Sequence, residues 1–285
     1  MTDKLRQLAK EILDSGKASL VIGYGNASLP NRTTPVFIKK SADADQLVWN
    51  EHCLNNLAVY LKSRPIKTDG KIAIVAKPCD IRAIVTLVQE NQIKRDDVII
   101  IGMVCAGMKD PDTGQLLDKC RCCKEHVPTF VDQIVGDPKS VKNLQPEAEF
   151  IDVDALEKMS PDERWEFWSK QFEKCIRCYA CRQVCPQCYC QRCIADKTMP
   201  QWISSVPDAK SNLSFAIFRA LHSAGRCIAC GECERVCPAG IPLNLLTEKM
   251  RKEIREKYGY ESGCDPESEA PMCHFKNEDK EDFIR

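Results

Sequence analysis

The chain has 285 residues, of which 44% are apolar, so it is long enough for one large domain or two modest ones with a hydrophobic core. Lysine plus arginine and aspartate plus glutamate number 41 each, and the resulting net charge of zero argues against nucleic acid as a partner, because phosphate binding requires excess positive charge. The first residues lack the apolar core of a secretory signal, and the longest apolar run, 98–108, is too short to span a bilayer, so we expect a cytoplasmic protein without direct membrane insertion.

Residues 1–157 are expected to form an α/β domain with a mostly parallel sheet. The amphipathic start, 1–13, predicts a helix, and helical periodicity predicts two more at 45–64 and 79–91. Short β-rich apolar runs predict strands at 19–25, 34–40, 71–77 and 97–105, with shorter ones at 130–136 and 150–156. Continuous apolar strands separated by helices are typical of a parallel sheet with helices on its faces.

The pattern changes after residue 157, and residues 158–258 are expected to form an all-α domain. Ser160, Pro161 and the acidic residues that follow them are a helix-start signature. Further helices are predicted at 211–227, with Ser211 as the cap, and at 243–259. This half has no strand pattern, and the polar residues 259–285 predict a poorly ordered C-terminal tail.

Nineteen cysteines are the unusual feature of the composition. Their odd number and clustered spacing favour metal binding over a disulfide framework in a chain without a secretory signal. Two runs share the spacing C-x₂-C-x₂-C-x₃-C-P. They are Cys175, Cys178, Cys181 and Cys185 followed by Pro186, and Cys227, Cys230, Cys233 and Cys237 followed by Pro238.

This run resembles that of bacterial two-cluster ferredoxins, where it holds [4Fe–4S] cubanes and the fourth cysteine ligates the other cluster. The resemblance implies one cluster on Cys175, Cys178, Cys181 and Cys237, and another on Cys227, Cys230, Cys233 and Cys185. Structural zinc, the alternative, is usually held by paired C-x₂-C knuckles. Because 41 residues (186–226) separate the runs and include a predicted helix, residues 160–255 resemble the α-helical ferredoxin domain of heterodisulfide reductase small subunits and succinate dehydrogenase iron–sulfur subunits.

Two further groups of cysteines require an explanation. The first group is Cys79, Cys105, Cys120, Cys122 and Cys123, and the second is Cys188, Cys190 and Cys193. Cys79 and Cys105 lie at or after the carboxyl ends of neighbouring predicted strands, which share one edge of a parallel sheet. We therefore expect four cysteines of the first group to hold a third cluster, with zinc, or a site made jointly with the second group, as the alternative. A solitary cysteine is usually a small core residue, which is the prediction for Cys53.

Two segments of the first half carry a further resemblance. They are KPCDIRA at 77–83, which contains Cys79, and the strand end that includes Ile101, Gly102 and Cys105. Over about residues 15–135, the chain resembles the beta-subunit family of coenzyme F420-reducing hydrogenases and formate dehydrogenases. The resemblance implies FAD, iron–sulfur clusters and electron exchange with F420 or another redox carrier. The chain departs from the family because its ferredoxin runs follow the α/β half instead of preceding it. A dinucleotide fingerprint is incomplete at GYGNAS, where only Gly23 and Gly25 are present.

The sequence therefore predicts an iron–sulfur electron-transfer subunit of an anaerobic oxidoreductase complex, with two [4Fe–4S] clusters and a third centre. Its expected partners are other subunits of a redox complex of the heterodisulfide reductase, hydrogenase or dehydrogenase type. The alternative is a flavin-containing catalytic subunit that oxidises or reduces a soluble carrier linked to F420, NAD or ferredoxin, with the clusters as an internal wire. A third hypothesis is a zinc scaffold without redox chemistry, which would contain zinc and no sulfide.

Overall fold

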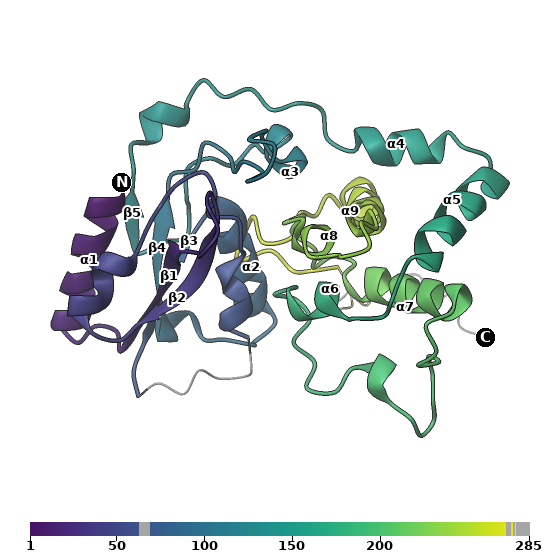
Figure 1. Ribbon diagram of the computed structural model, residues 1–285, viewed down its shortest axis with the longest axis horizontal. Helices are drawn as coiled ribbons and strands as arrows, with labels where there is room; N and C mark the ends of the chain where they lie inside the picture. Colours follow the sequence, from purple (N-terminus) through teal and green to yellow (C-terminus); the bar gives the residue numbers. More distant parts are fainter. Residues whose placement is uncertain (63–68, 272–274, 276, 278–285) are drawn as a thin grey trace.

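Residues 1–62, 69–271, 275 and 277 are described by the computed structural model of the chain (Figure 1). The first half is built on a five-stranded sheet with the order β2-β1-β3-β4-β5. The strands are β1 (Leu20–Asn26), β2 (Thr33–Ile38), β3 (Ile72–Ala76), β4 (Val98–Met103) and β5 (Gln133–Val135). β1 pairs with β2 antiparallel, whereas the pairs β1–β3, β3–β4 and β4–β5 are parallel. The prediction of a mostly parallel sheet is therefore confirmed.

Helices cover both faces of the sheet. α1 (Thr2–Asp14) and α2 (Pro78–Gln89) lie on opposite sides of the strands, and α2 faces the second half of the chain (Figure 1). α2 begins directly after β3 because Pro78 fits a first helical turn and the side chain of Asp80 accepts the backbone N–H of Lys77. The strands are largely apolar, so their side chains pack with those of both helices in one continuous core.

The second half consists of helices and loops, and its described residues contain no strand after β5. Its helices are α4 (Ile151–Glu157), α5 (Pro161–Glu173), α6 (Ala180–Gln183), α7 (Ala209–His222), α8 (Glu232–Arg235) and α9 (Leu243–Tyr258), and α3 (Asp118–Arg121) belongs to the first half. Short 3-10 helices occupy Ser41–Gln46, Leu57–Tyr60, Arg95–Asp97, Pro138–Val141 and Ile194–Asp196. α7 starts before its predicted cap, Ser211, because Asp208 accepts the N–H of Ser211 at 3.0 Å. Among the described residues, no helix has the length and apolar character needed to cross a membrane.

The predicted helix at 45–64 is wrong for the part that the structure describes, which is irregular apart from two 3-10 helices. Asparagine side chains give the backbone alternative partners here, because Asn50 accepts the N–H of His52 at 2.9 Å and Asn56 accepts that of Ala58 at 3.0 Å. The apolar residues of this segment are still buried, so the periodicity predicted their burial correctly but their helical conformation incorrectly. Residues 63 and 64 lie outside the described residues.

The predicted strand at 150–156 is also wrong, because α4 occupies these residues. Phe150 has a left-handed conformation with φ of 64°, which turns the chain immediately before the helix. Asp152 and Asp154 lie in the first turn, where negative charge stabilises a helix N-terminus. The prediction at 130–136 is confirmed only for the three residues of β5.

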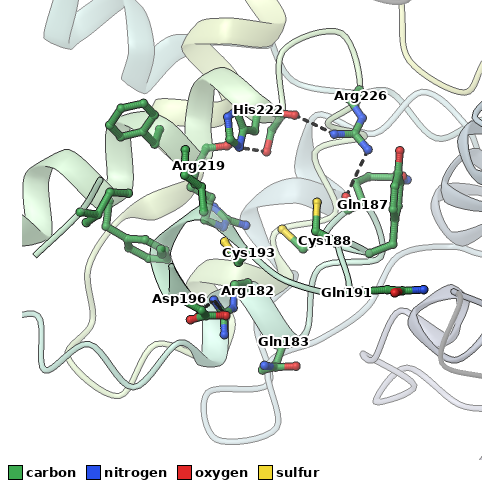
Figure 2. A pocket seen from close by; sticks show the side chains of 18 of the residues that line it. Arg182, Gln183, Gln187, Cys188, Gln191, Cys193, Asp196, Arg219, His222 and Arg226 are labelled. Carbon is green, nitrogen blue, oxygen red and sulfur yellow. Dashed lines mark hydrogen bonds and ion pairs between the residues drawn. The ribbon is translucent and has the colours of Figure 1, made fainter. Parts of the chain in front are cut away.

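Polar contacts join the two halves around the first cysteine run. Arg226 donates through Nη2 to Glu90, at the end of α2, at 2.8 Å. The same Nη2 donates to the carbonyl oxygen of Gln187 at 3.3 Å (Figure 2). Lys62 Nζ donates to the carbonyl oxygens of Gln183, Cys185 and Cys188 at 3.1, 3.0 and 3.2 Å. The first half therefore holds the chain on both sides of Cys185.

The C-terminal segment up to residue 271 lies against α2, which differs from the expected poorly ordered tail. Arg82 Nη2 donates to the carbonyl oxygen of Ser262 at 2.8 Å, and Gln89 Nε2 donates to that of Ser268 at 2.9 Å. Gly263 has φ of 73°, and a Cβ there would collide with the carbonyl oxygen of Arg82. Only glycine permits this backbone approach, so the tail is attached by a residue whose role the polar composition did not indicate.

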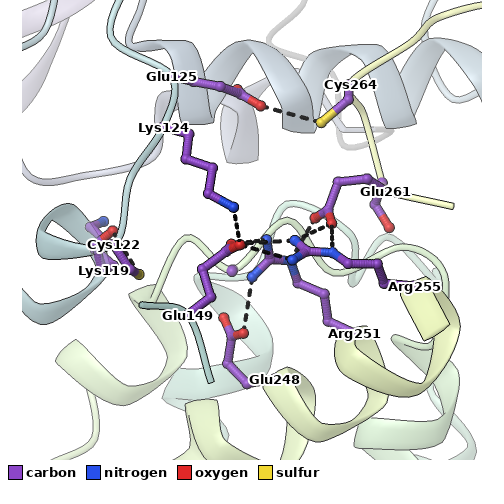
Figure 3. Close-up of polar contacts among 12 residues, drawn as sticks. Lys119, Cys122, Lys124, Glu125, Glu149, Glu248, Arg251, Arg255, Glu261 and Cys264 are labelled. Atoms are coloured by element: carbon purple, nitrogen blue, oxygen red, sulfur yellow. Dashed lines mark hydrogen bonds and ion pairs between the residues drawn. The ribbon is translucent and has the colours of Figure 1, made fainter. Parts of the chain in front are cut away.

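A network of ion pairs attaches the segment that precedes α4 to helix α9 (Figure 3). Glu149 pairs with Lys124 at 2.6 Å, with Arg251 at 2.8 Å and with Arg255 at 2.8 Å. Both arginines also pair with Glu261 of the C-terminal segment. Although burial raises the pKa of Glu149, hydrogen bonds from the three cations hold it well below its usual value. Glu149 therefore remains ionised and joins segments from both halves.

We predict that Glu149→Gln destabilises the protein by about 2–4 kcal/mol, because it leaves partly buried cations without their carboxylate. Since the folded pKa of Glu149 is lowered, its stabilisation is fully present above the unfolded-state pKa of about 4.3 and is lost only as the pH falls toward the folded value. Urea unfolding should thus give the same difference from the wild type at pH 6 and pH 8.

The matched control is Glu166→Gln, which removes a pair between Glu166 and Lys170 that is about two-thirds exposed on both sides. Exposed pairs of this kind contribute little, so this change should stay within about 0.5 kcal/mol. Equal changes in the free energy of unfolding for the two substitutions would show that the Glu149 network stabilises the protein no more than an exposed ion pair does.

Candidate metal centres

The two cysteine runs have the same local backbone. In each run, the residues on both sides of the middle cysteine have positive φ: Arg177 at 56° and Tyr179 at 60° around Cys178, and Ala229 at 56° and Gly231 at 67° around Cys230. A four-residue helix, α6 or α8, follows and carries the third cysteine. Of the four residues with positive φ, three are not glycine, and this conformation strains any other residue. Such strain persists only where the surrounding structure requires it.

This backbone fits an anionic cluster. Alternation between right-handed and left-handed residues turns successive N–H groups to one side and forms a concave nest that binds anions, including iron–sulfur centres. In the second run, the N–H of Ala229 lies 3.5 Å from Cys227 Sγ, so one such donor already faces a ligand sulfur. The donor set and its backbone therefore suit the [4Fe–4S] clusters that the spacing implies.

The fourth cysteine of the second run lies with the first run. Burial raises the pKa of Cys181, and the neighbouring thiols of Cys175, Cys237 and Cys178 add to this rise. Cys175, Cys181 and Cys237 also pack around the same apolar cluster, which includes Phe172 of α5. The structure thus brings together the four cysteines of the first predicted set.

The fourth cysteine of the first run lies with the second run. One small cavity is lined by Cys185 together with Cys227, Cys230 and Cys233. Burial raises the pKa of Cys233, and the thiols of Cys227 and Cys185 raise it further. The structure thus also brings together the second predicted set.

The two sets are neighbours. α6 packs against α8, and the thiol of Cys181 in α6 contributes to the raised pKa of Cys233 in α8, after burial and nearer charges. In the part of the chain that the structure describes, no three histidine, cysteine or acidic side chains converge on a single metal-ion position. A cubane does not need such convergence, since each of its thiolates binds a different iron.

A third set of cysteines lies between the two halves. Cys79, Cys105, Cys120 and Cys123 line a cavity of about 490 Å³ to which residues 228 and 229 of the second run also contribute. Cys79 and Cys105 meet there because β3 and β4 are parallel neighbours, with Ala76 opposite Gly102 near their carboxyl ends. The predicted meeting of these cysteines at one sheet edge is therefore observed.

The environment of this third set resembles that of cluster ligands. Burial raises the pKa of Cys105 to about 11, with Cys120 and Cys123 as the contributing thiols. The N–H of Gly107 lies 3.4 Å from Cys105 Sγ, and that of Met108 lies 3.3 Å from Cys120 Sγ. Backbone donors to sulfur are among the groups that set the potential of iron–sulfur centres.

Cys122 and Cys264 line the same cavity as this set. Cys122 Sγ donates to the carbonyl oxygen of Asp118 at 3.8 Å, and after burial the acidic neighbours Glu248 and Glu149 are the main causes of its raised pKa. Figure 3 shows Cys122 beside α3 and Cys264 bonded to Glu125, with Sγ and Oε1 3.2 Å apart. The charged neighbours that raise the pKa of Cys122 are thus carboxylates, whereas those of Cys105 include the thiols of Cys120 and Cys123.

The remaining group occupies a different pocket. Cys188, Cys190 and Cys193 line a cavity of about 140 Å³ between the loop after α6 and helix α7 (Figure 2). The cysteines of the third set are not among the residues that line it. The alternative of one site made jointly by both groups therefore receives no support from the geometry.

Two other expectations concern the first half. Gly23 and Gly25 lie inside β1, which continues into an antiparallel hairpin instead of a helix. A Cβ at Gly23 would collide with Leu47, so this glycine serves packing and not a phosphate loop. Cys53 is fully buried in the core, as predicted.

In the C-terminal segment, Cys273 lies outside the described residues.

The sequence analysis missed two buried cations. Lys119 Nζ donates to the carbonyl oxygen of Cys230 at 2.5 Å, although Lys119 belongs to the first half. Arg219 of α7 lines the cavity of the second cysteine set and is only 8% exposed. Lys119 precedes Cys120, which was its only sequence signal, and Arg219 had none beyond its helical spacing.

Residues 174–242, which contain both cysteine runs, match the family described as 4Fe-4S dicluster domain. The expectation of such a domain is thereby confirmed. The match is confined to these residues.

Two similar curated proteins come from Methanocaldococcus jannaschii and Methanococcus maripaludis. The first is "F420-dependent formate dehydrogenase subunit beta", 27% identical over 81% of this chain and 83% of that protein. The second is "F420-dependent formate dehydrogenase 1 subunit beta", 26% identical over 92% of this chain and 90% of that protein. A chain from the F420-reducing [NiFe] hydrogenase complex of Methanosarcina barkeri aligns with 37% of this chain and 38% of its own length, at 19% identity and a TM-score of 0.31. The chain thus carries a 4Fe-4S dicluster domain and is homologous, over most of its length, to beta subunits of F420-dependent formate dehydrogenases.

Proposed function

We propose that this chain is an iron–sulfur electron-transfer subunit of an oxidoreductase complex. The observation that carries the proposal is the crossed grouping of cysteines, in which Cys237 joins the first run and Cys185 joins the second. Crossed ligation places two cubanes next to each other, and each cluster, when bound, accepts and releases single electrons. The protein contributes the distance between the clusters, their burial and the charges around them.

The proposed ligands form three sets. The first is Cys175, Cys178, Cys181 and Cys237, the second is Cys227, Cys230, Cys233 and Cys185, and the third is Cys79, Cys105, Cys120 and Cys123. In the third set, one buried cysteine (Cys105), three partly buried cysteines and backbone N–H donors support an iron–sulfur centre, with zinc as the alternative metal.

The three sets follow one another in space, which supports a relay. Lys119 lies between the third set and the second, because it is next to Cys120 in the chain and bonds to the carbonyl oxygen of Cys230. The second set adjoins the first through α6 and α8. Cys178 of the first set is exposed, so electrons would enter or leave the molecule at that end.

The corresponding domain division is an α/β domain at 1–157, an all-α dicluster domain at 158–258 and a C-terminal segment at 259–285. The helical content of the described second half and the dicluster family match support the middle assignment. The contacts between α2 and the C-terminal segment support treating that segment as an attachment between the domains.

We further propose that the partners are other subunits of a dehydrogenase complex with F420-linked electron transfer. The names of the two formate dehydrogenase relatives support this choice of partner. The flavin-containing alternative retains the same clusters and adds FAD, so a measurement of the flavin content separates it from the electron-transfer proposal.

The test is the iron, acid-labile sulfide, zinc and flavin content of protein purified without oxygen. We expect about 12 iron and 12 sulfide per chain from three cubanes, with no zinc. About 8 of each would remove the third centre from the proposal, and zinc without sulfide would overturn the electron-transfer function. One flavin per chain would favour the catalytic alternative.

We predict that Cys185→Ser damages the cluster of the second run more than that of its own run. Reference spectra come from Cys181→Ser and Cys233→Ser, each of which removes an undisputed ligand of one cluster. The electron paramagnetic resonance spectrum of reduced Cys185→Ser should resemble that of Cys233→Ser.

Because Cys188 forms a hydrogen bond with Cys185, it is placed to replace the lost ligand, so the double variant Cys185→Ser/Cys188→Ser is measured in parallel. Spectra of both variants that match Cys181→Ser instead would show that ligation is not crossed.

We also predict that Cys120→Ser/Cys123→Ser lowers the iron content by about 4 per chain, because it removes two ligands of the third set. Cys122→Ser is the matched control, since the main charged neighbours of this cysteine are the carboxylates of Glu248 and Glu149 and not thiols, and it should leave the iron content unchanged. Loss of iron in the control alone would mean that the wrong four cysteines are assigned.

A further inference from the structure

Arg219 occupies a buried position between the two cysteine sets of the dicluster domain. It lies on the inner face of α7, where Asn212, Phe215, Ala216 and Ala220 are also buried. Its Nη2 donates to the carbonyl oxygen of Cys181 at 3.3 Å, and the side chain lines the cavity of Cys185, Cys227, Cys230 and Cys233. One guanidinium thus contacts the first run and faces the second set.

The charge of Arg219 has no carboxylate partner among the described residues. Three other arginines near the ligands differ in this respect, because Arg182 pairs with Asp196, Arg226 with Glu90 and Arg235 with Glu232. Arg177 also has no carboxylate partner among the described residues, but its guanidinium donates to the carbonyl oxygens of Ser211 and Ser204 and does not line the cavity of the second set. The Nε of Arg219 is buried and finds no hydrogen-bond acceptor in the part of the chain that the structure describes. Figure 2 shows its side chain beside Cys188 and Cys193 in the adjoining pocket.

A buried cation is costly unless an anion compensates it. The nearest anion-forming groups of Arg219 are thiols: although burial disfavours its charge, Cys233, Cys185 and Cys181 raise the pKa of the guanidinium. Two of these cysteines are proposed ligands of the second cluster and one of the first. Cluster charge on both sides would therefore supply the missing counterion.

We propose that Arg219 is the counter-charge shared by both cubanes and raises their reduction potentials, an inference that rests on the proposed electron-transfer function. Reduction adds one negative charge to a cluster, and a nearby buried cation stabilises the reduced form more than the oxidised form. Arg219 is therefore a positioning and tuning residue, because it acts through the ligands and the field at the clusters. The second cluster depends on it more, since two of its ligand cysteines face the guanidinium.

The test is a redox titration of the intact holoprotein, followed by electron paramagnetic resonance, for Arg219→Gln and Arg219→Lys. At a fixed potential, Arg219→Gln should lower the ratio of reduced to oxidised second cluster about tenfold, which corresponds to about 59 mV for a one-electron couple. Arg219→Lys retains the charge and should shift the ratio much less. The control Arg182→Gln removes an arginine beside Cys181 that is already paired with Asp196, so its effect should also be small.

Iron and sulfide contents measured on the same samples separate the two proposals. Two cubanes in the wild type and in Arg219→Gln with unchanged potentials would overturn the role of Arg219 and leave the electron-transfer function standing. Equal shifts in Arg219→Gln and Arg219→Lys would mean that packing, and not charge, is responsible. If Arg219→Gln does not retain its clusters, the Arg219→Lys variant decides. Clusters retained in Arg219→Lys with potentials near those of the wild type support the charge role. A tenfold change in its ratio of reduced to oxidised second cluster contradicts that role. Absence of clusters from the wild type would overturn both proposals.

Discussion

The cost of burying charge governs the arrangement of this protein. Its proposed ligand cysteines function as thiolates, yet burial raises the pKa of most of those whose shifts are resolved, such as Cys105 and Cys233. Cations and backbone N–H groups at the ligands offset this cost. Lys119 lies between the third and second cysteine sets and Arg219 between the second and first, and the left-handed residues on both sides of Cys178 and Cys230 form a backbone that favours anions. Lys119 pairs with Glu232 at 3.8 Å, whereas a bound cluster would supply the anion that Arg219 lacks among the described residues.

The same groups also determine how the halves are joined. Lys119 belongs to the first half and bonds to the second cysteine run, while Lys62 bonds to the carbonyl oxygens around Cys185. Contacts that orient ligand loops are therefore also contacts between domains. A rigid interface of this kind keeps the distances between centres fixed, which a relay of single electrons requires. The ion network around Glu149 adds a second attachment on the far side of the cavity that holds the third set.

Spacing along the chain predicted the parts of this structure that depend on local pattern. The two cysteine runs, the parallel strands and the meeting of Cys79 with Cys105 at one edge follow from periodicity and strand order. The irregular segment at 45–64 was missed because its asparagines form local hydrogen bonds, and α4 was missed because alternation in seven residues is ambiguous. Lys119 and Arg219 act across large sequence separations, which no local pattern contains. The proposed choice of Cys123 over Cys122 rests on their different neighbours at the end of α3, which spacing alone does not define.

The two halves differ in what stabilises them, and this difference follows from their cores. The first half has one continuous apolar core between the sheet and its helices, as an independent domain does. The apolar clusters of the second half are small, and cysteines of both runs pack against them. Helices as short as α6 and α8 are unstable without tertiary support, so the ligand loops require the metal centres to fix them. If the clusters bind as proposed, their binding would therefore add to the stability of the second half, whereas the first half has a core of its own.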